Sequence, residues 1–508
     1  MSAPDLLALR NGQRADRAAV PLLATDRFVD VVAEGPKRGL RIAALFGAPA
    51  DGGRLELFAV LADDEQGLVL LARTRVDGDA YPAVTPRAAQ AHLFEREIAE
   101  QWGVRPEGHP WLKPVRFVRS NVAGRDAWGR PPDSPLVCGV MDFYRVEGEE
   151  VHEVAVGPVH AGVIEPGHFR FQCHGEHVFH LEISLGYQHR GVERALVGGP
   201  GKRAIHHVET ASGDTTVGHA TAYCQNVEAL SGTRVSSRAH ALRAVALELE
   251  RMANHTGGLG ALAGDVGFLP TASFCGRLRG DFLNLSAAVC GSRFGRALVR
   301  PGGVGFDVDR MRADDMLAKL DAAVADVDAA VAVLEESPSV QARFEDTGRV
   351  DSALAAELGL VGVAARACGL ARDVRHDHPA GAWCFTQVPM SVWDSGDVFA
   401  RAHVRWKEIQ RSAAFVRAQL KSLPRGASRA AVSALRPDSV CVSLVEGWRG
   451  EICHVALTGS DGRFATYKLV DPSFHNWAGL AVALRDEQIS DFPLCNKSFD
   501  LSYCGHDL

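Results

Sequence analysis

The residues that first suggest chemistry in this sequence are histidines, because seven of its 20 histidines lie in one short stretch. Imidazole is a common ligand for zinc, copper and iron, so a metal site is one interpretation. Successive side chains of a strand point to opposite faces, however, and the sequence contains no HExxH spacing. We therefore predict structural or proton-handling roles rather than an independent metal site. The seven residues are His152, His160, His168, His174, His177, His180 and His189.

A second chemical pattern is a set of ionisable side chains at helix spacing. Glu248, Arg251 and His255 lie at positions i, i+3 and i+7 of a helix that begins near Ser237, which places them on one face. One interpretation is a solvated face whose ion pair contributes only ~0.2–0.5 kcal/mol. The other is a charged relay buried in a helical bundle, where such groups are costly unless paired. The sequence leaves both interpretations open.

Signatures of nucleotide binding are missing from the sequence. Neither GxGxxG nor GxxxxGK(S/T) occurs, so we expect no NADH or ATP site on this chain.

The eleven cysteines include no CxxC pair, and their number is odd. The amino terminus carries Asp5, Arg10 and Arg14 where a secretory signal needs an apolar stretch. We therefore expect reduced thiols, most of them small core residues.

The elements that must position these side chains begin with an α+β unit over residues 1–118. Three β-rich segments are separated by turn signals, and a helix follows that ends before Gly103. Residues 119–136 are rich in glycine, proline and charge, so we predict a linker over residues 119–150. The predicted strands are Leu40–Leu45, Leu55–Ala62 and Gly67–Val76, and the predicted helix is Pro86–Trp102.

Residues 151–508 begin with a β pattern and then become helical. Three long apolar stripes recur at helix spacing, and such helices need one another to bury their faces, so we expect a bundle. Ser236 and Ser237 are candidate N-caps of the first helix. A short β-rich tail follows the bundle, and the predicted fold class is therefore α+β, with a central helical bundle and small β-sheets. The stripes are Leu242–Met252, Met316–Leu334 and Ala402–Leu420.

Length and composition set the class of molecule. With 508 residues, of which 46% are hydrophobic and 23% charged, two or three globular units are expected. The formal net charge of −7 argues against nucleic acid as a partner, because phosphate-binding proteins usually carry a basic surplus. No segment reaches the ~18 apolar residues that suggest a transmembrane helix. We expect a cytoplasmic chain whose membrane contact comes through partners.

Ordered motifs run along nearly the whole chain. They are Glu95–Glu97, Trp102–Val104, Gly108–Pro110, Gly157–Phe169, Leu185–Glu193, Arg300–Val304, Glu446–Glu451 and Asp471–Phe474. The first three resemble the signature of the smaller, thirty-kilodalton-type peripheral subunit of complex I (NADH-quinone oxidoreductase). The others resemble the large subunit of formate-hydrogenlyase-type NiFe hydrogenases and the related forty-nine-kilodalton-type subunit of complex I. The resemblance implies a domain like the smaller complex I subunit at 1–118, fused to a domain like the larger complex I subunit or the hydrogenase large subunit at 151–508.

The positions that would hold nickel depart from the hydrogenase pattern. In the hydrogenases, two CxxC pairs bind nickel and iron, the first just before a His-x-x-Ala-Tyr segment (here His219–Tyr223) and the second after Asp-Pro. This sequence has Ser212 and Thr215 at the first pair and Ser473 and Asn476 at the second. Neutral hydroxyls and an amide do not replace soft anionic thiolates, so a NiFe centre is not expected.

Quinone is the redox partner that the resemblance to complex I implies instead. In that family a tyrosine near the same loop and a histidine of the first β-hairpin are implicated in binding the quinone headgroup. Gly213 stands where the tyrosine is expected, and His160 or His168 would supply the histidine. The cavity, lined by Asp214 and His219 among others, would bind quinone differently or bind nothing redox-active. Both alternatives stay open.

The resemblance also implies residue roles and partners. Arg449 would hold an anionic or carbonyl oxygen bidentately, Glu248 and His168 would pass protons, and Arg251 would complete the predicted catalytic set. We expect no metal ligands on this chain, iron–sulfur clusters on a small partner subunit, NAD only at the level of the complex, and membrane subunits that translocate protons. The chain would be a peripheral oxidoreductase subunit at the cytoplasmic face of the cytoplasmic membrane. A non-catalytic assembly and coupling scaffold is the main alternative, and an active NiFe hydrogenase is disfavoured.

Overall fold

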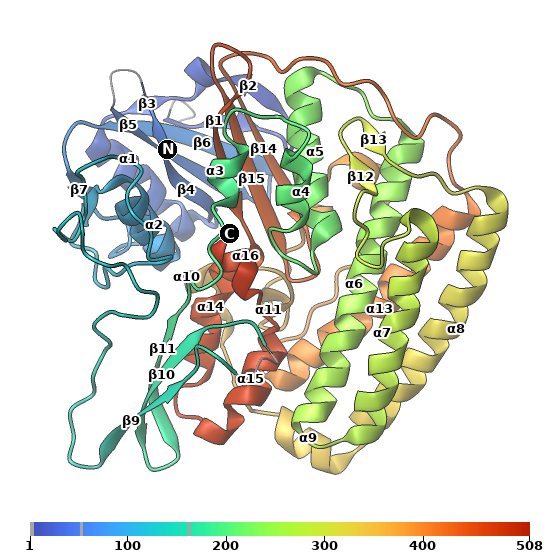
Figure 1. The fold of residues 1–508 in the computed structure, drawn as a ribbon. Coiled ribbons are helices and arrows are strands. Elements are labelled where there is room, and N and C mark those ends of the chain that lie inside the picture. Colours follow the sequence, from blue (N-terminus) through green and yellow to red (C-terminus); the bar gives the residue numbers. More distant parts are fainter. Residues whose placement is uncertain (1–4, 51–53, 161–163) are drawn as a thin grey trace.

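The computed structural model describes residues 5–50, 54–160 and 164–508. Its N-terminal part is built on a five-stranded sheet in the order β1-β6-β5-β4, with β3 added to β6 in parallel (Figure 1). Every residue of β5 is buried, and because alternate side chains point to opposite faces, both faces of this sheet are covered. The strands are β1 (Leu7–Leu9), β3 (Leu22–Leu23), β4 (Arg41–Pro49), β5 (Leu55–Asp63) and β6 (Leu68–Val76).

Two helices, α1 (Thr25–Glu34) and α2 (His92–Trp102), pack on this sheet. The three predicted strands are confirmed as β4, β5 and β6, but the predicted helix begins only at His92. The carboxylate of Glu95 accepts hydrogen bonds of 2.8 Å from the backbone N–H groups of Val84 and Thr85. These bonds hold the chain before α2 in a turn, so the helix starts later than its apolar pattern suggests. It ends at Gly103 as predicted, where φ is +63°.

A second sheet joins the two ends of the chain. Its order is β16-β15-β14-β2, and β2 from the amino terminus pairs antiparallel with β14, so that Ala15 lies opposite Val440. The apolar core of the N-terminal sheet continues into these strands. The predicted division at 118 and 151 stays a prediction, while the core itself is shared across it. The strands are β2 (Arg14–Asp16), β14 (Ser439–Glu446), β15 (Glu451–Thr458) and β16 (Phe464–Val470).

A third sheet carries the histidine-rich stretch. Strands β9 (Val151–Val156), β10 (His168–His174) and β11 (His177–Ser184) form an antiparallel sheet in the order β11-β10-β9, which confirms the β pattern expected there. Phe169 and Phe171 of β10 point into the large core and are fully buried. Among the residues that the structure describes, no group of three or more His, Cys, Asp or Glu side chains is arranged to hold a metal ion.

Four long helices form the bundle at the right of Figure 1. All three predicted stripes face its core, and Ser236 caps α6 by accepting a hydrogen bond from the N–H of Ala239 at 3.1 Å. Helix α7 was not predicted: Leu278, Phe282, Leu285 and Val289 form an apolar stripe in its second half, but Thr271 and Cys275 take the buried positions of its first turns. The α+β class is confirmed. The helices are α6 (Ser237–Asp265), α7 (Leu269–Cys290), α8 (Arg310–Glu335) and α13 (Val398–Lys421).

Shorter elements connect the sheets and the bundle. Among them, α5 lies against β14 and β15, and α14 lies against β11. All eleven cysteines are free, and nine of them are buried, as predicted for small core residues. The remaining elements are β7 (Ala80–Pro82), β8 (Arg105–Glu107), β12 (Val299–Arg300), β13 (Gly303–Val304), α3 (Val192–Leu196), α4 (Ala204–Glu209), α5 (Thr216–Ser231), α9 (Pro338–Phe344), α10 (Ser352–Leu358), α11 (Gly362–Arg366), α12 (Val374–Asp377), α14 (Pro472–Ala483), α15 (Phe492–Phe499) and α16 (Tyr503–Asp507).

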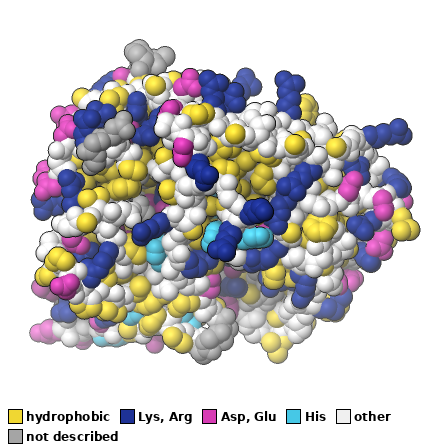
Figure 2. Space-filling view, turned by 45° about the horizontal axis from the view of Figure 1, so that its top comes forward, with side chains coloured by type: hydrophobic (Ala, Val, Ile, Leu, Met, Phe, Trp, Pro, Cys, Tyr) yellow, Lys and Arg dark blue, Asp and Glu magenta, His cyan; other side chains and the backbone are white. Residues whose placement is uncertain are grey.

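The surface charge is not evenly distributed. On the face shown in Figure 2, Lys and Arg side chains gather towards the middle and top among hydrophobic ones, and Asp and Glu lie mainly towards the two sides. The net charge of −7 therefore does not describe this face. Among the helices described, none combines the length and apolar character needed to cross a membrane.

The start of α11 depends on a close backbone approach. Gly362 has φ +63°, and a Cβ there would overlap the carbonyl oxygen of Arg449 and the Cα of Gly450. We expect Gly362→Ala to lower the free energy of unfolding by more than the ~1–3 kcal/mol that a left-handed backbone alone costs a non-glycine residue. Chemical denaturation of the purified chain measures this loss. The matched control is Gly276→Ala in α7, where nothing lies within 4 Å, and it should stabilise by ~0.5–1 kcal/mol.

Candidate functional site

The centre of the candidate site is an ion pair between two loops. Arg449 lies in the turn between β14 and β15, and Asp214 lies between α4 and α5. The guanidinium donates from Nη1 and Nη2 to the two carboxylate oxygens of Asp214 at 2.6 and 2.8 Å. The guanidinium carbon Cζ of Arg449 lies over the ring of Trp448, 3.8 Å from its centroid. Burial disfavours the carboxylate, but Arg449 outweighs this and lowers the pKa of Asp214 to about 2, so the pair stays charged.

Buried hydroxyl groups surround this pair. The Ser212 hydroxyl lies 2.9 Å from that of Ser502, and the Thr215 hydroxyl donates to Asp214 at 3.1 Å. The hydroxyl oxygen of Ser473 accepts a hydrogen bond of 2.8 Å from the N–H of Ser502. Asn476 is separate from this group in its bonding, because its amide exchanges two hydrogen bonds with the backbone of Val361. Of the four positions singled out by the sequence, Ser212 and Thr215 therefore lie next to the fixed cation, with their hydroxyl oxygens 3.5 and 3.3 Å from Nη1 of Arg449. Ser473 is connected to them through Ser502.

A chain of buried hydrogen bonds begins beside the hydroxyls. Nε2 of His219 lies 3.0 Å from the carboxylate of Asp471, and Nδ1 of His219 lies 3.1 Å from Nε2 of His454. Nδ1 of His454 lies 2.9 Å from the Tyr467 hydroxyl. Although burial opposes it, the hydrogen bond from His219 lowers the pKa of Asp471, while burial lowers the pKa of His454. The consistent assignment is that Tyr467 donates to His454, His454 to His219, and His219 to Asp471.

The ionisable face of α6 is buried, which decides between the two interpretations left open by the sequence. Glu248, Arg251 and His255 have no exposed surface. Glu248 accepts hydrogen bonds at one oxygen from Arg251 at 3.1 Å and from Arg375 at 3.0 Å. These side chains belong to a larger buried charge cluster, made of Glu248, Arg251, His255, Arg366, Asp373, Arg375, Glu408 and Glu446.

Protonation balances the buried charge cluster. Burial, together with the nearby charge of Asp373, raises the pKa of Glu446 to about 7, and burial lowers the pKa of His255 to about 4. His255 is therefore uncharged near neutral pH, and Glu446 can take up or release a proton there. By formal charge, the three arginines balance Glu248, Asp373 and Glu408, so the cluster is neutral when Glu446 is protonated and gains one negative charge when Glu446 releases its proton. A group that changes charge near neutral pH inside a hydrogen-bonded cluster can take part in proton transfer.

The ion pair and the buried charge cluster meet at the turn after β14. Arg251 donates to the carbonyl oxygens of Glu446 and Gly447 at 2.8 and 3.1 Å. Two residues later, the ring of Trp448 lies edge-on to that of His255 with 6.0 Å between centroids, and Trp448 donates to the carbonyl oxygen of Asp214 at 3.2 Å. The predicted residues Asp214, Glu248, Arg251 and Arg449 are thus brought into one connected region, with His219 at its hydroxyl side.

The two histidines of the hairpin have other neighbours. Nε2 of His160 lies 2.9 Å from the carbonyl oxygen of Gly167, and His168 accepts a hydrogen bond from Arg170 at 3.2 Å. Burial lowers the pKa of His168, so its imidazole is neutral near pH 7. The structure gives neither histidine a contact with Arg449 or Asp214 among the described residues, and positions 161–163 of their motif lie outside that part. Their roles stay predictions.

Sequence reasoning missed several members of this region. Asp471 carried a signal, since an aspartate followed by proline marks the start of a helix and its carboxylate caps α14 through the N–H of Ser473 at 2.8 Å. His454 is one side chain of a fully buried strand, and Glu408 is one of several charged residues of α13, although it lies on the buried side, so neither stood out. Only their partners on distant segments distinguish them.

Glu250 was also missed, and it predicts a pH dependence of stability. It accepts hydrogen bonds from the N–H groups of Val217 and Gly218 at 2.7 and 3.1 Å, yet burial outweighs these bonds and raises its pKa to about 8. Between the ordinary value of 4.5 and about 8, the folded state keeps a proton that the unfolded chain has released. The free energy of unfolding therefore falls as pH rises through this window.

Glu250→Gln is expected to remove that slope, because the amide is neutral at every pH, although it keeps only one of the two acceptor oxygens. In thermal midpoints measured from pH 5 to 9, the variant should therefore gain stability relative to the wild type as pH rises towards 9. The exposed Glu357→Gln should follow the wild-type profile throughout. Parallel profiles for wild type and Glu250→Gln would show that the Glu250 proton is not linked to folding.

Comparison with known proteins follows the same two parts of the chain. Residues 24–128 match the family model described as respiratory-chain NADH dehydrogenase, 30 kDa subunit, and residues 265–440 match that of the 49 kDa subunit. Formate hydrogenlyase subunit 5 of Escherichia coli (strain K12) is 28% identical over 495 residues, which cover 93% of this chain and 85% of the relative.

Two further relatives match 69% of the chain each. The carbon monoxide-induced hydrogenase of Rhodospirillum rubrum is 31% identical over 354 residues, or 69% of this chain and 97% of the relative. NADH-quinone oxidoreductase subunit 4 of Thermus thermophilus is 27% identical over 380 residues, or 69% of this chain and 92% of the relative. Hydrogenases and quinone oxidoreductases are thus both among the proteins that this chain resembles.

Proposed function

The chain belongs to the family that unites the fused 30 kDa and 49 kDa subunits of complex I with the large subunits of formate-hydrogenlyase-type hydrogenases. From this premise we propose that it is a subunit of a complex I-like redox complex. In that complex the redox partner is quinone rather than a NiFe centre. Its electron transfer is coupled to proton translocation by partner subunits. The chain itself contributes Arg449, a cation that binds the quinone oxygen, and the buried charge cluster, a path for protons.

One observation carries the choice of quinone over metal. Where hydrogenases of this family hold nickel and iron with thiolates, the hydroxyls of Ser212 and Thr215 are hydrogen-bonded to the Arg449–Asp214 pair. The hydroxyl of Ser473 is linked to that of Ser212 through Ser502. Hard neutral oxygens beside a fixed guanidinium do not fit a soft dinuclear metal centre, since a cation repels a metal ion. The same guanidinium fits a carbonyl oxygen that gains negative charge during reduction.

The reaction needs two electrons and two protons for each quinone converted to quinol. Iron–sulfur clusters of a small partner subunit supply the electrons, and NAD is used only elsewhere in the complex. Arg449 stabilises the negative charge that develops on the quinone oxygen. The buried charge cluster brings protons towards the turn that carries Arg449, with Glu446 as the group that releases them near neutral pH. Membrane subunits that move protons hold the chain at the cytoplasmic face of the membrane.

A second function has support from one observation. Arg449 and Asp214 close on each other in a bidentate pair, and three cavities of the described residues, of about 340, 390 and 360 Å³, are lined by other residues. A region closed in this way is also what a non-catalytic assembly and coupling scaffold would contain. The two functions differ in whether quinone turnover depends on the Arg449 guanidinium.

The test uses the purified native complex. The complex is reduced with dithionite and then freed of excess dithionite by gel filtration, because dithionite itself reduces quinones. On addition of a short-chain ubiquinone, we expect quinol formation beyond that of a protein-free control, with nickel well below one atom per chain and no hydrogen turnover. Nickel at one atom per chain together with hydrogen turnover would overturn the proposal. Intact complex that translocates protons but reduces no quinone at this subunit would instead favour the scaffold.

A further inference from the structure

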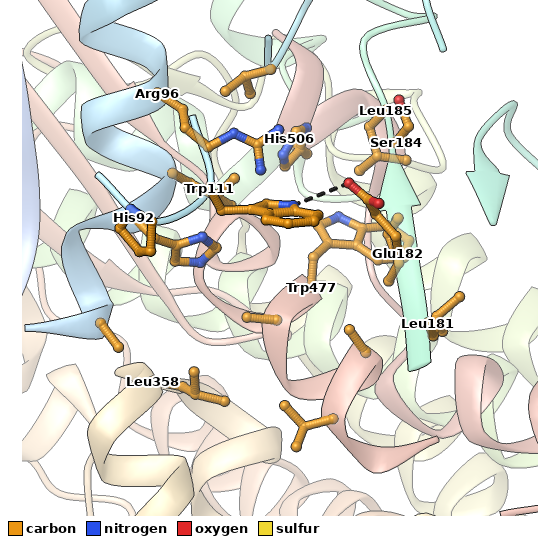
Figure 3. A pocket seen from close by; sticks show the side chains of 18 of the residues that line it. His92, Arg96, Trp111, Leu181, Glu182, Ser184, Leu185, Leu358, Trp477 and His506 are labelled. Carbon is orange, nitrogen blue, oxygen red and sulfur yellow. Dashed lines mark hydrogen bonds between the residues drawn. The ribbon is translucent and has the colours of Figure 1, made fainter. Parts of the chain in front are cut away.

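A second cavity-lining region lies away from the Arg449–Asp214 pair. A cavity of about 340 Å³ opens where α2 and the loop after it meet β11 and α14 (Figure 3). Two indole rings, those of Trp111 and Trp477, lie near its middle, and aliphatic and proline side chains make up more than half of its wall. The volume is at the lower end of the ~300–1,000 Å³ range of small-molecule sites. We call it the interdomain cavity.

Polar groups without partners point to a ligand in this cavity. The indole N–H of Trp477 and the hydroxyl of Ser184 have no hydrogen-bond partner among the described residues, although their side chains are only 3% and 4% exposed. Nε2 of His180, in the same wall, is also without a partner in that part of the chain. Leaving a buried donor unpaired costs free energy, so such groups are usually satisfied by something that binds.

The contrast with Trp111 shows which groups are already used. The Trp111 indole donates to the carboxylate of Glu182 at 3.1 Å, and Lys113 donates to the same oxygen at 2.8 Å. Glu182 also accepts a hydrogen bond from the N–H of Tyr144 at 2.8 Å. The carboxylate of the wall is therefore neutralised and occupied, which leaves donors in excess over acceptors.

The unbalanced charge in the wall is positive. Arg96 is 8% exposed and uses two of its nitrogens, Nε and Nη2, to donate to the carbonyl oxygens of Lys113 and Pro114 at 2.8 Å each. Nη1 makes no hydrogen bond with the described residues. Burial lowers the pKa of Arg96 only to about 10 and that of His92 to about 3, so near pH 7 the arginine is charged and the histidine is neutral. Arg485 adds a second cation at the rim.

We propose that the interdomain cavity binds a small organic anion with an apolar, ring-sized body, whose acidic group lies against Arg96 and whose acceptor atoms take hydrogen bonds from Trp477 and Ser184. The indole rings contact the body. Such a ligand supplies what the wall lacks, namely acceptors and one negative charge, and its apolar part matches the rest of the lining.

Helix α14 connects the interdomain cavity to the candidate redox region. Helix α14 passes from Asp471 and Ser473, at the candidate redox region, to Trp477 and Ala481 in the wall of the cavity. The opposite wall comes from α2 of the N-terminal part. A bound anion therefore contacts both parts of the chain, and it contacts the helix that carries Ser473, one of the hydroxyl residues of the candidate redox region.

The test measures dye binding to the purified full-length chain and needs no redox turnover, so its result is independent of the proposed function. The probe is 8-anilino-1-naphthalenesulfonate, an aromatic anion, and its neutral analogue is N-phenyl-1-naphthylamine, which lacks the sulfonate. Fluorescence titration should give saturable binding of the anion at one site per chain, with the neutral analogue at least tenfold weaker. Equal affinity for the two dyes would overturn the assignment of an anion site.

Three variants locate the bound dye. Ala481→Phe fills the cavity and should abolish the saturable phase, and Trp477→Phe keeps a ring but removes the N–H and should weaken binding about three- to tenfold. The matched control is Trp102→Phe, which removes an equally unpartnered indole N–H from a different cavity, of about 390 Å³, and should leave the affinity unchanged. Unchanged binding in folded Ala481→Phe or Trp477→Phe, judged by wild-type circular dichroism, would overturn the proposal.

Discussion

Replacing Arg449 by glutamine is expected to slow quinone reduction by the assembled complex about 100- to 1,000-fold, the usual cost of removing a preorganised donor that stabilises developing charge. The guanidinium is held in place by Asp214, by the ring of Trp448 and by the carbonyl oxygen of Asp500, so its position is fixed before an oxygen binds. Glutamine offers a single neutral amide at a shorter reach. Turnover per complex, normalised to the amount of this chain, measures the loss.

Controls separate chemistry from folding in the Arg449 experiment. Arg449→Lys keeps the positive charge but not the two parallel N–H donors of the guanidinium, so its turnover should fall less than that of Arg449→Gln. The double variant with Asp214→Asn avoids leaving a carboxylate without its partner, and it should assemble well yet stay slow. Arg277→Gln, which removes an exposed arginine from α7, should keep full turnover. An Arg449→Gln complex within threefold of wild type would favour the scaffold function.

Glu408→Gln is expected to lower the free energy of unfolding by about 3–5 kcal/mol, the range found when one partner of a buried ion pair is removed. One carboxylate oxygen of Glu408 accepts hydrogen bonds from Arg366 at 3.0 and 2.7 Å, and the other accepts from Arg251 at 3.2 Å and His255 at 2.8 Å. Both arginines are fully buried. The amide leaves their charge uncompensated, and denaturant titration of the purified chain measures the loss.

The Glu408 prediction has a control and a pH signature. Asp281→Asn breaks an exposed pair with Arg277 and should change stability by less than about 1 kcal/mol. Burial favours the neutral form of Glu408, but Arg366 and the hydrogen bond from His255 lower its pKa well below 4.5. Its contribution is therefore present above the unfolded pKa and is lost only as pH falls through the folded one. The gap between wild type and variant should hold from pH 8 to 5 and narrow below; a gap that is absent at pH 7 would contradict the prediction.

These two predictions concern different properties of one connected region. Arg449 faces the hydroxyl groups where a reacting oxygen would lie, whereas Glu408 lies deeper, among the cations of the buried charge cluster. A loss of turnover without loss of stability at Arg449, and the reverse at Glu408, would separate the group that meets the substrate from the groups that support it.

Local sequence determined the elements and the family. Strands β4 to β6 and the helices of the bundle other than α7 follow from the spacing of apolar residues, because the period of a strand or helix decides which side chains share a face. The motifs along the chain identified the resemblance, and Ser212, Thr215, Ser473 and Asn476 already removed the thiolates from the nickel positions. These features depend on residue type and on neighbours close in sequence.

Only the tertiary structure decided what is buried and what is paired. From the sequence alone, the helix face with Glu248, Arg251 and His255 could equally be exposed to solvent. It is buried because Glu408 and Arg375, from segments more than 100 residues away in the sequence, pair with these side chains. In the same way, β2 finds β14 across the whole chain, and the interdomain cavity exists only where α2 meets α14. Burial of charge depends on compensation by distant partners, and no local pattern encodes which partner arrives.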